Sequence, residues 1–428
     1  MERERGFGVL GAFAVAFLAT ADLPTRVTLF EQSGTAYLVG GLAYFLVIVA
    51  AGLLAVRLRL DLSTQAGVLR SGRTVPIVMW WLLAWGAISL ILHGAPAGEE
   101  TVQTILCLWL FVVGMWYVAH TTTSRGIVQT ERWYPRAGWM LALFYGISLV
   151  VYGFGSDEFI GRRSFGMVAA LLIAWLAGQW THLRPVHRLL SFILLAETAL
   201  SGSRTATAIA FVVFAAASLS KTAKTGQLIF RVVAGIAAFA AAVLYYQPLQ
   251  DRFSTGDLSL VAFGIPINVE GRVVLWAGLL RYGEVAPWTG QGLGASQAIV
   301  RDLTSGRINQ PHNEFLRLWV DLGYIGLGLV LLGLITLAAR IWWLVRIDTD
   351  HRPTHASALL MLAALIAFFA TDNPLVYIFA IIPTAVTVGQ SLSFGRGLGY
   401  PTRSSATGGP RPASGTAARG ARTPSSRR

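Results

Sequence analysis

Long apolar runs separated by short polar loops constrain this chain more than any other feature of its sequence. Of its 428 residues, 54% are hydrophobic and only 13% are charged, and the mean hydropathy is +0.59. A soluble domain carries about 25% charged residues, so a single water-soluble core cannot bury this much apolar surface. We therefore expect an all-α polytopic integral membrane protein.

About twelve of these runs are long enough, or nearly long enough, to cross a bilayer as helices. They are 7–23, 35–56, 75–94, 102–119, 138–155, 165–180, 187–203, 205–220, 228–246, 314–345, 356–371 and 374–391. The first run precedes Ala19-Thr20-Ala21, which resembles a signal-peptide cleavage site. We expect this run to be retained as a helix, because the loop charges then alternate without exception.

The basic residues, which give a formal charge of +13, fall in alternate loops and in the tail. The loop 57–74 holds four arginines, whereas 95–101 holds two acids and no base. The positive-inside rule then places both termini in the cytoplasm. This distribution favours membrane topology over nucleic-acid binding as the reason for the positive charge.

The predicted domain organisation follows from these helices and loops. Helices 1–9 occupy 1–246, a large periplasmic loop occupies 247–313, and helices 10–12 occupy 314–391. The tail 392–428, with seven arginines and no acid, is typical of a disordered basic segment. Inside the loop, 271–283 has apolar residues at helical spacing, which predicts an amphipathic helix. These residues are Val273, Trp276, Leu279 and Leu280.

His312 is the candidate catalytic residue, because it lies at the end of the large loop directly before a long apolar helix. Asn313 is a good N-cap, and Glu314 suits the first helical turn. A neutral histidine at this position can take a proton from a hydroxyl. The alternative is a histidine that only caps the helix end.

Two arginines on the same side of the membrane are candidates for binding phosphate. Arg204 follows a very short turn between two apolar runs, where a charge is costly unless it faces protein or a ligand. Its planar guanidinium suits a phosphate, although the spacing also allows an ion pair with Glu197. Arg272 lies in the first turn of the predicted amphipathic helix.

Two further polar turns complete the predicted outer face. Gly290, Gly292 and Gly294 suit an anion-binding turn, but no strand precedes them, so they are not a dinucleotide fingerprint. Asp372 lies in the tight turn 371–374, where it either contacts the site or only forms the turn. No cluster on this face has metal-ligand spacing.

Four segments carry a resemblance to a known family. They are SGSRTA at 201–206, GRVVLW at 271–276, WTGQGLG at 288–294 and PHNEFLRLWVDLGYIG at 311–326. In this order they resemble the O-antigen ligase and polymerase superfamily of bacterial membrane glycosyltransferases. Asp372 and Asn373 fit the family's late outer turn, and the resemblance extends over 1 to about 391.

The resemblance implies a GT-C-like fold and a metal-independent, inverting glycosyltransferase in the bacterial inner membrane, with a periplasmic active site. The implied donor is a glycan on undecaprenyl pyrophosphate, no cofactor is implied, and the other partners are a glycan acceptor and membrane lipids. The resemblance makes His312 the general base and assigns the pyrophosphate to Arg204 and Arg272. The supporting residues are Asn313, Glu314, Gly292 and Asp372.

The sequence leaves the acceptor open. A ligase transfers the glycan to lipid A–core, a polymerase joins repeat units, and a third branch glycosylates protein hydroxyls. A single large outer loop favours the ligase. A transporter of lipid-linked sugars is the alternative from another class, and it would be expected to show internal repeats.

Overall fold

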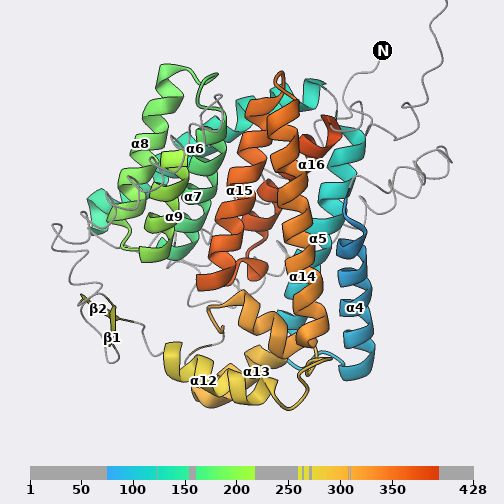
Figure 1. The fold of residues 1–428 in the computed structure, drawn as a ribbon. Coiled ribbons are helices and arrows are strands. Elements are labelled where there is room, and N and C mark those ends of the chain that lie inside the picture. The colour runs from blue at the N-terminus through green and yellow to red at the C-terminus, as the bar shows by residue number, and fades with distance from the viewer. Residues whose placement is uncertain are drawn as a thin grey trace, which may run out of the picture.

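The computed structural model describes residues 75–122, 124–153, 161–216, 259–262, 265–268, 272–306, 308 and 310–394 (Figure 1). Within these residues the chain forms a bundle of helices and one antiparallel hairpin, β1 (Ser259–Ala262) with β2 (Ile265–Asn268). Two short helices, α12 (Arg272–Gly283) and α13 (Ala295–Leu303), lie across one end of the bundle (Figure 1). The runs predicted at 7–23, 35–56 and 228–246, and the tail beyond Phe394, lie outside the described residues.

Each helix of the bundle overlaps one predicted apolar run. They are α4 (Ile77–His93), α5 (Glu99–Thr121), α6 (Ser124–Tyr152), α7 (Arg162–Gly178), α8 (Pro185–Leu200), α9 (Arg204–Ala215), α14 (Glu314–Ile347), α15 (Arg352–Thr371) and α16 (Ile378–Phe394). Three helices in the described ranges are long and apolar enough to cross a membrane: Thr101–Thr121 of α5, α14 and α15. Apart from the hairpin, the described residues are helical and of membrane type, as predicted. The number of twelve membrane spans stays a prediction.

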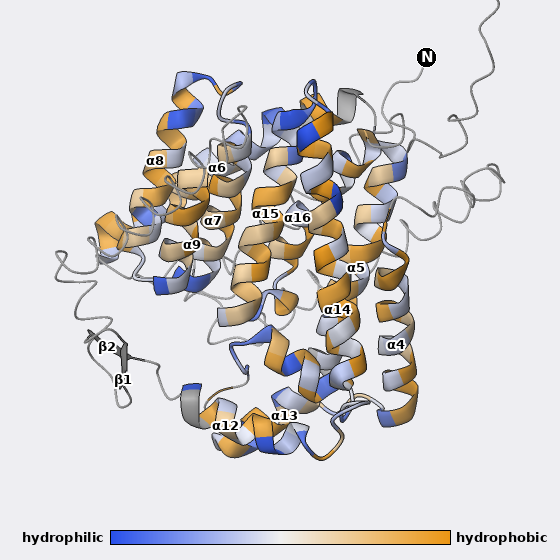
Figure 2. Ribbon diagram, viewed as in Figure 1, coloured by the Kyte–Doolittle hydropathy of each residue, from blue (hydrophilic) through white to orange (hydrophobic). Residues whose placement is uncertain are grey.

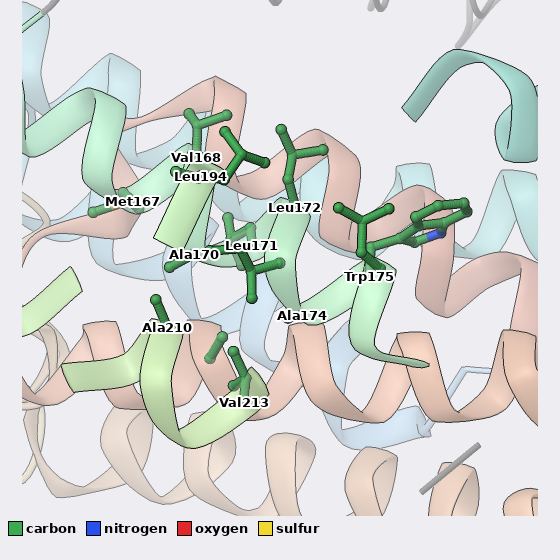
Figure 3. Close-up of a cluster of buried hydrophobic side chains, with 14 of the residues drawn as sticks. Met167, Val168, Ala170, Leu171, Leu172, Ala174, Trp175, Leu194, Ala210 and Val213 are labelled. Atoms are coloured by element: carbon green, nitrogen blue, oxygen red, sulfur yellow. The ribbon is translucent and has the colours of Figure 1, made fainter. Parts of the chain in front are cut away.

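The helix α7 forms the centre of one half of the bundle. Every residue from Ser164 to Gly178 is buried, as expected for a helix that is apolar on all sides. Its side chains pack against Leu194 of α8 and against Ala210 and Val213 of α9 (Figure 3). A second core joins α4, α5, α14, α15 and α16.

Hydrophobic residues predominate along the helices of the bundle, drawn in orange in Figure 2. Helices α4, α6 and α14 expose large hydrophobic side chains, among them Ile91, Val150 and Ile335. Such surfaces suit contact with lipid, because the hydrocarbon core favours apolar side chains.

The helix α14 is interrupted at Gly323, which adopts φ 67° and ψ −172°. The backbone groups freed by this interruption are bound by the glycine-rich loop that precedes α13. Tyr324 N donates to Pro287 O at 2.7 Å and Ile325 N donates to Trp288 O at 3.2 Å. On the other side of the interruption, Val320 O and Asp321 O accept from loop amides. The interruption therefore leaves these polar groups satisfied, as buried backbone requires.

The predicted amphipathic helix 271–283 corresponds to α12. Leu275 and Leu279 are buried against α14, whereas Leu280 is 48% exposed. Neither α13 nor the hairpin was predicted from the sequence.

Candidate functional site

His312 lies at the entrance to α14, with the chain fixed on both sides of it. Its φ of 55° places it in the left-handed region, which is uncommon for a residue other than glycine. Before it, Pro311 O accepts a hydrogen bond from Trp276 Nε1 at 2.8 Å. After it, Asn313 Oδ1 caps the helix by accepting from Leu316 N at 3.0 Å. The predicted cap is thus present at Asn313, and the backbone at His312 is held in a strained conformation.

The turn between α15 and the short helix η3 (Pro374–Val376) holds the ring of His312. Asn373 Oδ1 accepts from His312 N at 2.8 Å, and Asn373 Nδ2 lies 2.9 Å from His312 Nδ1. Asp372 Oδ1 lies 3.6 Å from the same ring nitrogen. The turn predicted at 371–374 therefore reaches the candidate catalytic residue through two neighbouring side chains.

The other ring nitrogen faces an arginine that was not among the candidates predicted from the sequence. Arg163 Nη1, on the first turn of α7, lies 3.3 Å from His312 Nε2. Burial of Asp372 raises its pKa, but the neighbouring His312, the backbone N–H of Asn373 and then the charge of Arg163 outweigh burial and hold the pKa of Asp372 below its usual value. The site therefore keeps Asp372 as a carboxylate beside a histidine and a guanidinium.

Arg272, a predicted phosphate ligand, lies next to this turn. It is the first residue of α12, and its Nη1 donates to Thr371 O at 3.1 Å. One turn further along the same helix, Trp276 holds Pro311. Helix α12 thus contacts the chain beside both Asp372 and His312.

Arg204, the second predicted phosphate ligand, begins α9 after a turn of three residues, 201–203. This end of α9 packs tightly on the first turns of α7. A Cβ at Gly166 would lie 2.7 Å from Ala206 Cβ and 3.1 Å from Ser203 Cβ. Because Gly166 is one helical turn from Arg163, the two arginines start neighbouring helices at the same end of the bundle.

The alternative ion pair between Glu197 and Arg204 receives no support from the structure. Glu197 is 9% exposed, and its Oε2 has no hydrogen-bond partner among the described residues. Its other carboxylate oxygen faces Gly146 of α6, where an added Cβ would lie 3.1 Å from Oε1.

Glu314, a predicted supporting residue, is completely buried in an ionic cluster. Arg317 Nη1 donates to Glu314 Oε1 at 3.1 Å, and Arg317 Nε lies 3.7 Å from Asp321 Oδ2. Arg317 also contacts Thr104 Oγ1 on α5. The side chains of Glu314, Arg317 and Asp321 are each 0% exposed, so this cluster acts below the site and not at its surface.

Gly292, the remaining supporting residue, lies where the glycine-rich loop packs on α4 and α14. A Cβ at Gly292 would lie 2.6 Å from His93 Cβ. The neighbouring amides of Gly294 and Ser296 donate to the carboxylate of Asp321 at 3.0 and 2.8 Å. In this structure the anion bound by the loop is therefore Asp321, and a contact between Gly292 and substrate stays a prediction.

Within the described residues, no group of three or more His, Cys, Asp or Glu side chains is arranged to hold a metal ion. The sequence Asp348-Thr349-Asp350-His351, which resembles a metal-binding carboxylate pair, lies at the opposite end of α14. Asp348 Oδ2 lies 3.1 Å from His351 Nδ1 and 3.2 Å from His355 Nε2.

Two residues of the site were missed as candidates, Arg163 and Asn373. Arg163 lies directly before the predicted apolar run 165–180, and a charge in that position is a signal that could have selected it. Asn373 was treated only as part of a turn. Its contact with His312 joins positions 61 residues apart, and no local pattern in the sequence signals it.

The fold and the site together define a helical protein of membrane type with a histidine, a carboxylate and arginines gathered at one end of the bundle. Residues 189–331 match the family described as O-antigen ligase. This match confirms the resemblance to the O-antigen ligase and polymerase superfamily, whose members are membrane glycosyltransferases acting on lipid-linked glycans. It includes Arg204, Arg272 and His312, but neither Arg163 nor the turn at 372–373. No curated protein sequence matches this chain.

Proposed function

We propose that this protein moves a glycan from undecaprenyl pyrophosphate to a sugar hydroxyl of lipid A–core, at the periplasmic face of the bacterial inner membrane. The observation that carries this proposal is the environment of the His312 ring. A carboxylate lies 3.6 Å from Nδ1, and a guanidinium lies 3.3 Å from Nε2. A general base next to a phosphate-binding cation is the minimum that glycosyl transfer from a pyrophosphate requires.

In the proposed reaction, His312 Nε2 takes the proton of the acceptor hydroxyl. The hydroxyl oxygen forms a bond to the anomeric carbon on the side opposite the pyrophosphate. The bond from that carbon to the phosphate oxygen breaks, and its electron pair leaves with undecaprenyl pyrophosphate. A single displacement of this kind inverts the anomeric configuration. Asp372 stabilises the imidazolium that forms, because it remains ionised beside the ring.

The leaving pyrophosphate would be held by arginines from three helices. Arg163 lies in the first turn of α7, Arg204 begins α9 and Arg272 begins α12. Guanidinium groups suit this role because they bind phosphate oxygens in pairs and stay charged. Charge that develops on the leaving group is then stabilised by the protein without a metal ion.

The short turn between α8 and α9 supports the choice of the ligase reaction. Only 201–203 separate the two helices, whereas polymerases of the superfamily often carry a second large outer loop. The acceptor separates ligase from polymerase and from protein glycosylation, so the test must offer acceptors of each kind.

The test is glycan transfer in proteoliposomes that contain undecaprenyl-pyrophosphate glycan and purified lipid A–core, with a hydroxyl-bearing acceptor peptide supplied in parallel. Wild type should produce capped lipid A–core, and His312→Ala should produce none while its thermal unfolding stays close to that of wild type. His182→Ala is the matched control, because His182 is exposed in the turn between α7 and α8. This control should retain full transfer.

Other products would assign other functions. Longer donor chains without capped lipid A–core would move the protein to the polymerase reaction. A glycosylated acceptor peptide would indicate the protein-modifying branch. Movement of the lipid-linked glycan between leaflets, unchanged in His312→Ala and without any transfer, would overturn the enzyme proposal in favour of transport.

A further inference from the structure

The two hydrogen bonds between Asn373 and His312 fix the orientation of the Asn373 amide. The backbone N–H of His312 can only donate, so the atom that faces it at 2.8 Å must be the amide oxygen. The amide nitrogen of Asn373 therefore faces His312 Nδ1 at 2.9 Å. Asn373 is 0% exposed, so water does not compete for these contacts.

This orientation determines where the neutral imidazole carries its proton. An amide nitrogen is a donor, so Nδ1 must accept and cannot itself be protonated. The proton then lies on Nε2, the nitrogen next to Arg163. In this tautomer Nε2 has no free lone pair, and it cannot take a proton from an acceptor hydroxyl.

Asp372 favours the opposite tautomer. Its Oδ1 lies 3.6 Å from the same Nδ1, slightly beyond hydrogen-bond distance, and it already accepts from Asn373 N at 2.9 Å. A carboxylate can only accept, so closer contact with Asp372 requires a proton on Nδ1 and leaves the Nε2 lone pair free. Asn373 and Asp372 thus compete for one ring nitrogen with opposite requirements.

One of the other charged groups around the ring takes part in this competition. Arg163 from α7 donates toward Nε2 at 3.3 Å, which favours a lone pair there as Asp372 does, but this contact is longer than the 2.9 Å contact between Asn373 Nδ2 and Nδ1. Arg272 from α12 is directed to Thr371 O. The carboxylate of Glu314 on α14 accepts from Arg317 and from Leu375 N, away from the ring.

We propose that Asn373 is a positioning residue that keeps the resting His312 protonated on Nε2, and that His312 becomes a base only when its Nδ1 passes from Asn373 to Asp372. In this step the ring first takes a proton from water at Nδ1 once that nitrogen has left Asn373, and the imidazolium, which faces Asp372, then releases the proton of Nε2 to water, so the net charge of the ring does not change. The inference rests on the proposed function. A resting His312 that is protonated on Nε2 cannot act as a base on water, so the lipid-linked donor is not hydrolysed when no acceptor is bound.

The test begins with nitrogen NMR of detergent-solubilised protein labelled with ¹⁵N in its seven histidines. His312→Gln identifies the His312 signals by difference. Wild type should show an unprotonated Nδ1 and a protonated Nε2. Asn373→Asp should reverse them, because its carboxylate accepts where the amide donated. A wild-type ring already protonated on Nδ1, or no reversal in Asn373→Asp, would overturn the proposal.

Gln310→Glu is the matched control, because it adds the same charge two residues from His312. Gln310 Oε1 accepts from Gln297 Nε2 at 3.1 Å, so the His312 signals should keep their wild-type pattern. Reversal in this control would mean that charge alone, and not the Asn373 contact, places the proton, and this would also overturn the proposal.

A second readout connects the tautomer to the reaction. Asn373→Asp should increase hydrolysis of undecaprenyl-pyrophosphate glycan in the absence of acceptor, and Gln310→Glu should not. In Asn373→Asp, the acidic limb of the plot of transfer rate against pH should also move to higher pH, since a second carboxylate stabilises the imidazolium. If hydrolysis is unchanged in Asn373→Asp although the NMR signals reverse, the proposal that Asn373 keeps His312 inactive at rest is overturned.

If wild type shows the expected NMR pattern but transfers no glycan at all, the result counts against the proposed function and not against the role of Asn373.

Discussion

Glu314 Oε1 accepts a hydrogen bond from Leu375 N at 3.1 Å, which ties the start of α14 to the helix that follows Asp372 and Asn373. His312 precedes Glu314 by two residues, and Asn373 precedes Leu375 by two. One buried carboxylate therefore fixes the distance between the two chain segments whose side chains meet at the imidazole.

The buried cluster of Glu314, Arg317 and Asp321 predicts a large loss of stability when its cation is removed. Arg317→Met leaves two buried carboxylates without their cationic partner, and breaking a buried pair in this way costs about 3–5 kcal/mol. Thermal unfolding in detergent should show this loss. Arg301→Met, on the exposed side of α13, should stay within about 0.5 kcal/mol of wild type. Equal stability of the two variants would show that the cluster contributes little.

Lysine substitutions test the role of the three arginines. Arg163→Lys, Arg204→Lys and Arg272→Lys keep the charge but lose the two-pronged contact with phosphate. Each should lower kcat/KM for transfer, on the order of 10-fold or more, because losing one donor to developing charge costs up to about 10²–10³-fold in other enzymes. Arg301→Lys should have no effect. Full activity in all three site variants would exclude the phosphate-binding role.

The interruption at Gly323 predicts opposite effects for two glycines of the same helix. A Cβ at Gly323 would collide with the carbonyl of Trp288, and φ is positive there, so Gly323→Ala should destabilise the protein. At Gly328 nothing lies within 4 Å of an added Cβ. Gly328→Ala should therefore be neutral or stabilising by up to about 1 kcal/mol. Unfolding temperatures that fall equally in both variants would contradict this account.

The lowered pKa of Asp372 predicts how its contribution to stability depends on pH. A carboxyl whose pKa is lowered by folding stabilises the protein above its unfolded pKa of about 3.9, and this stability is lost as pH falls through the folded pKa. Asp372→Asn should therefore lower the unfolding temperature at pH 7. The difference from wild type should persist down to about pH 5 and shrink at lower pH. A difference that grows on acidification would mean that the pKa of Asp372 is raised.

Removal of metal ions is expected to leave transfer unchanged. The proposed reaction assigns the charge of the leaving group to arginines, so EDTA should not alter the initial rate. Inhibition by EDTA that is restored by Mg²⁺ or Ca²⁺ would contradict the metal-independent reaction.

The helices of the bundle could be predicted from the sequence because apolar runs report burial or lipid contact directly. Residues of the candidate site could be predicted only where the local sequence carried a signal. For Arg204 this signal was a charge at membrane depth, and for His312 it was a polar residue directly before a helix. The contacts of Asn373 and Arg163 with His312 depend on how α7, α14 and α15 pack. Periodicity assigned Trp276 to a helix, but only the structure shows that its Nε1 binds Pro311 O.

The interruption at Gly323 also affects how the bilayer can act on the site. Residues 314–322 and 324–347 are two helical segments joined through the loop amides and carbonyls that bind both sides of the interruption. Tilting of the longer segment in a thicker or thinner bilayer is therefore not transmitted to His312 along one continuous helix. Such a change passes through the loop 286–292, or through α7 and the turn 371–374, whose side chains contact the ring, so lipid composition is coupled to the geometry of the base through these contacts.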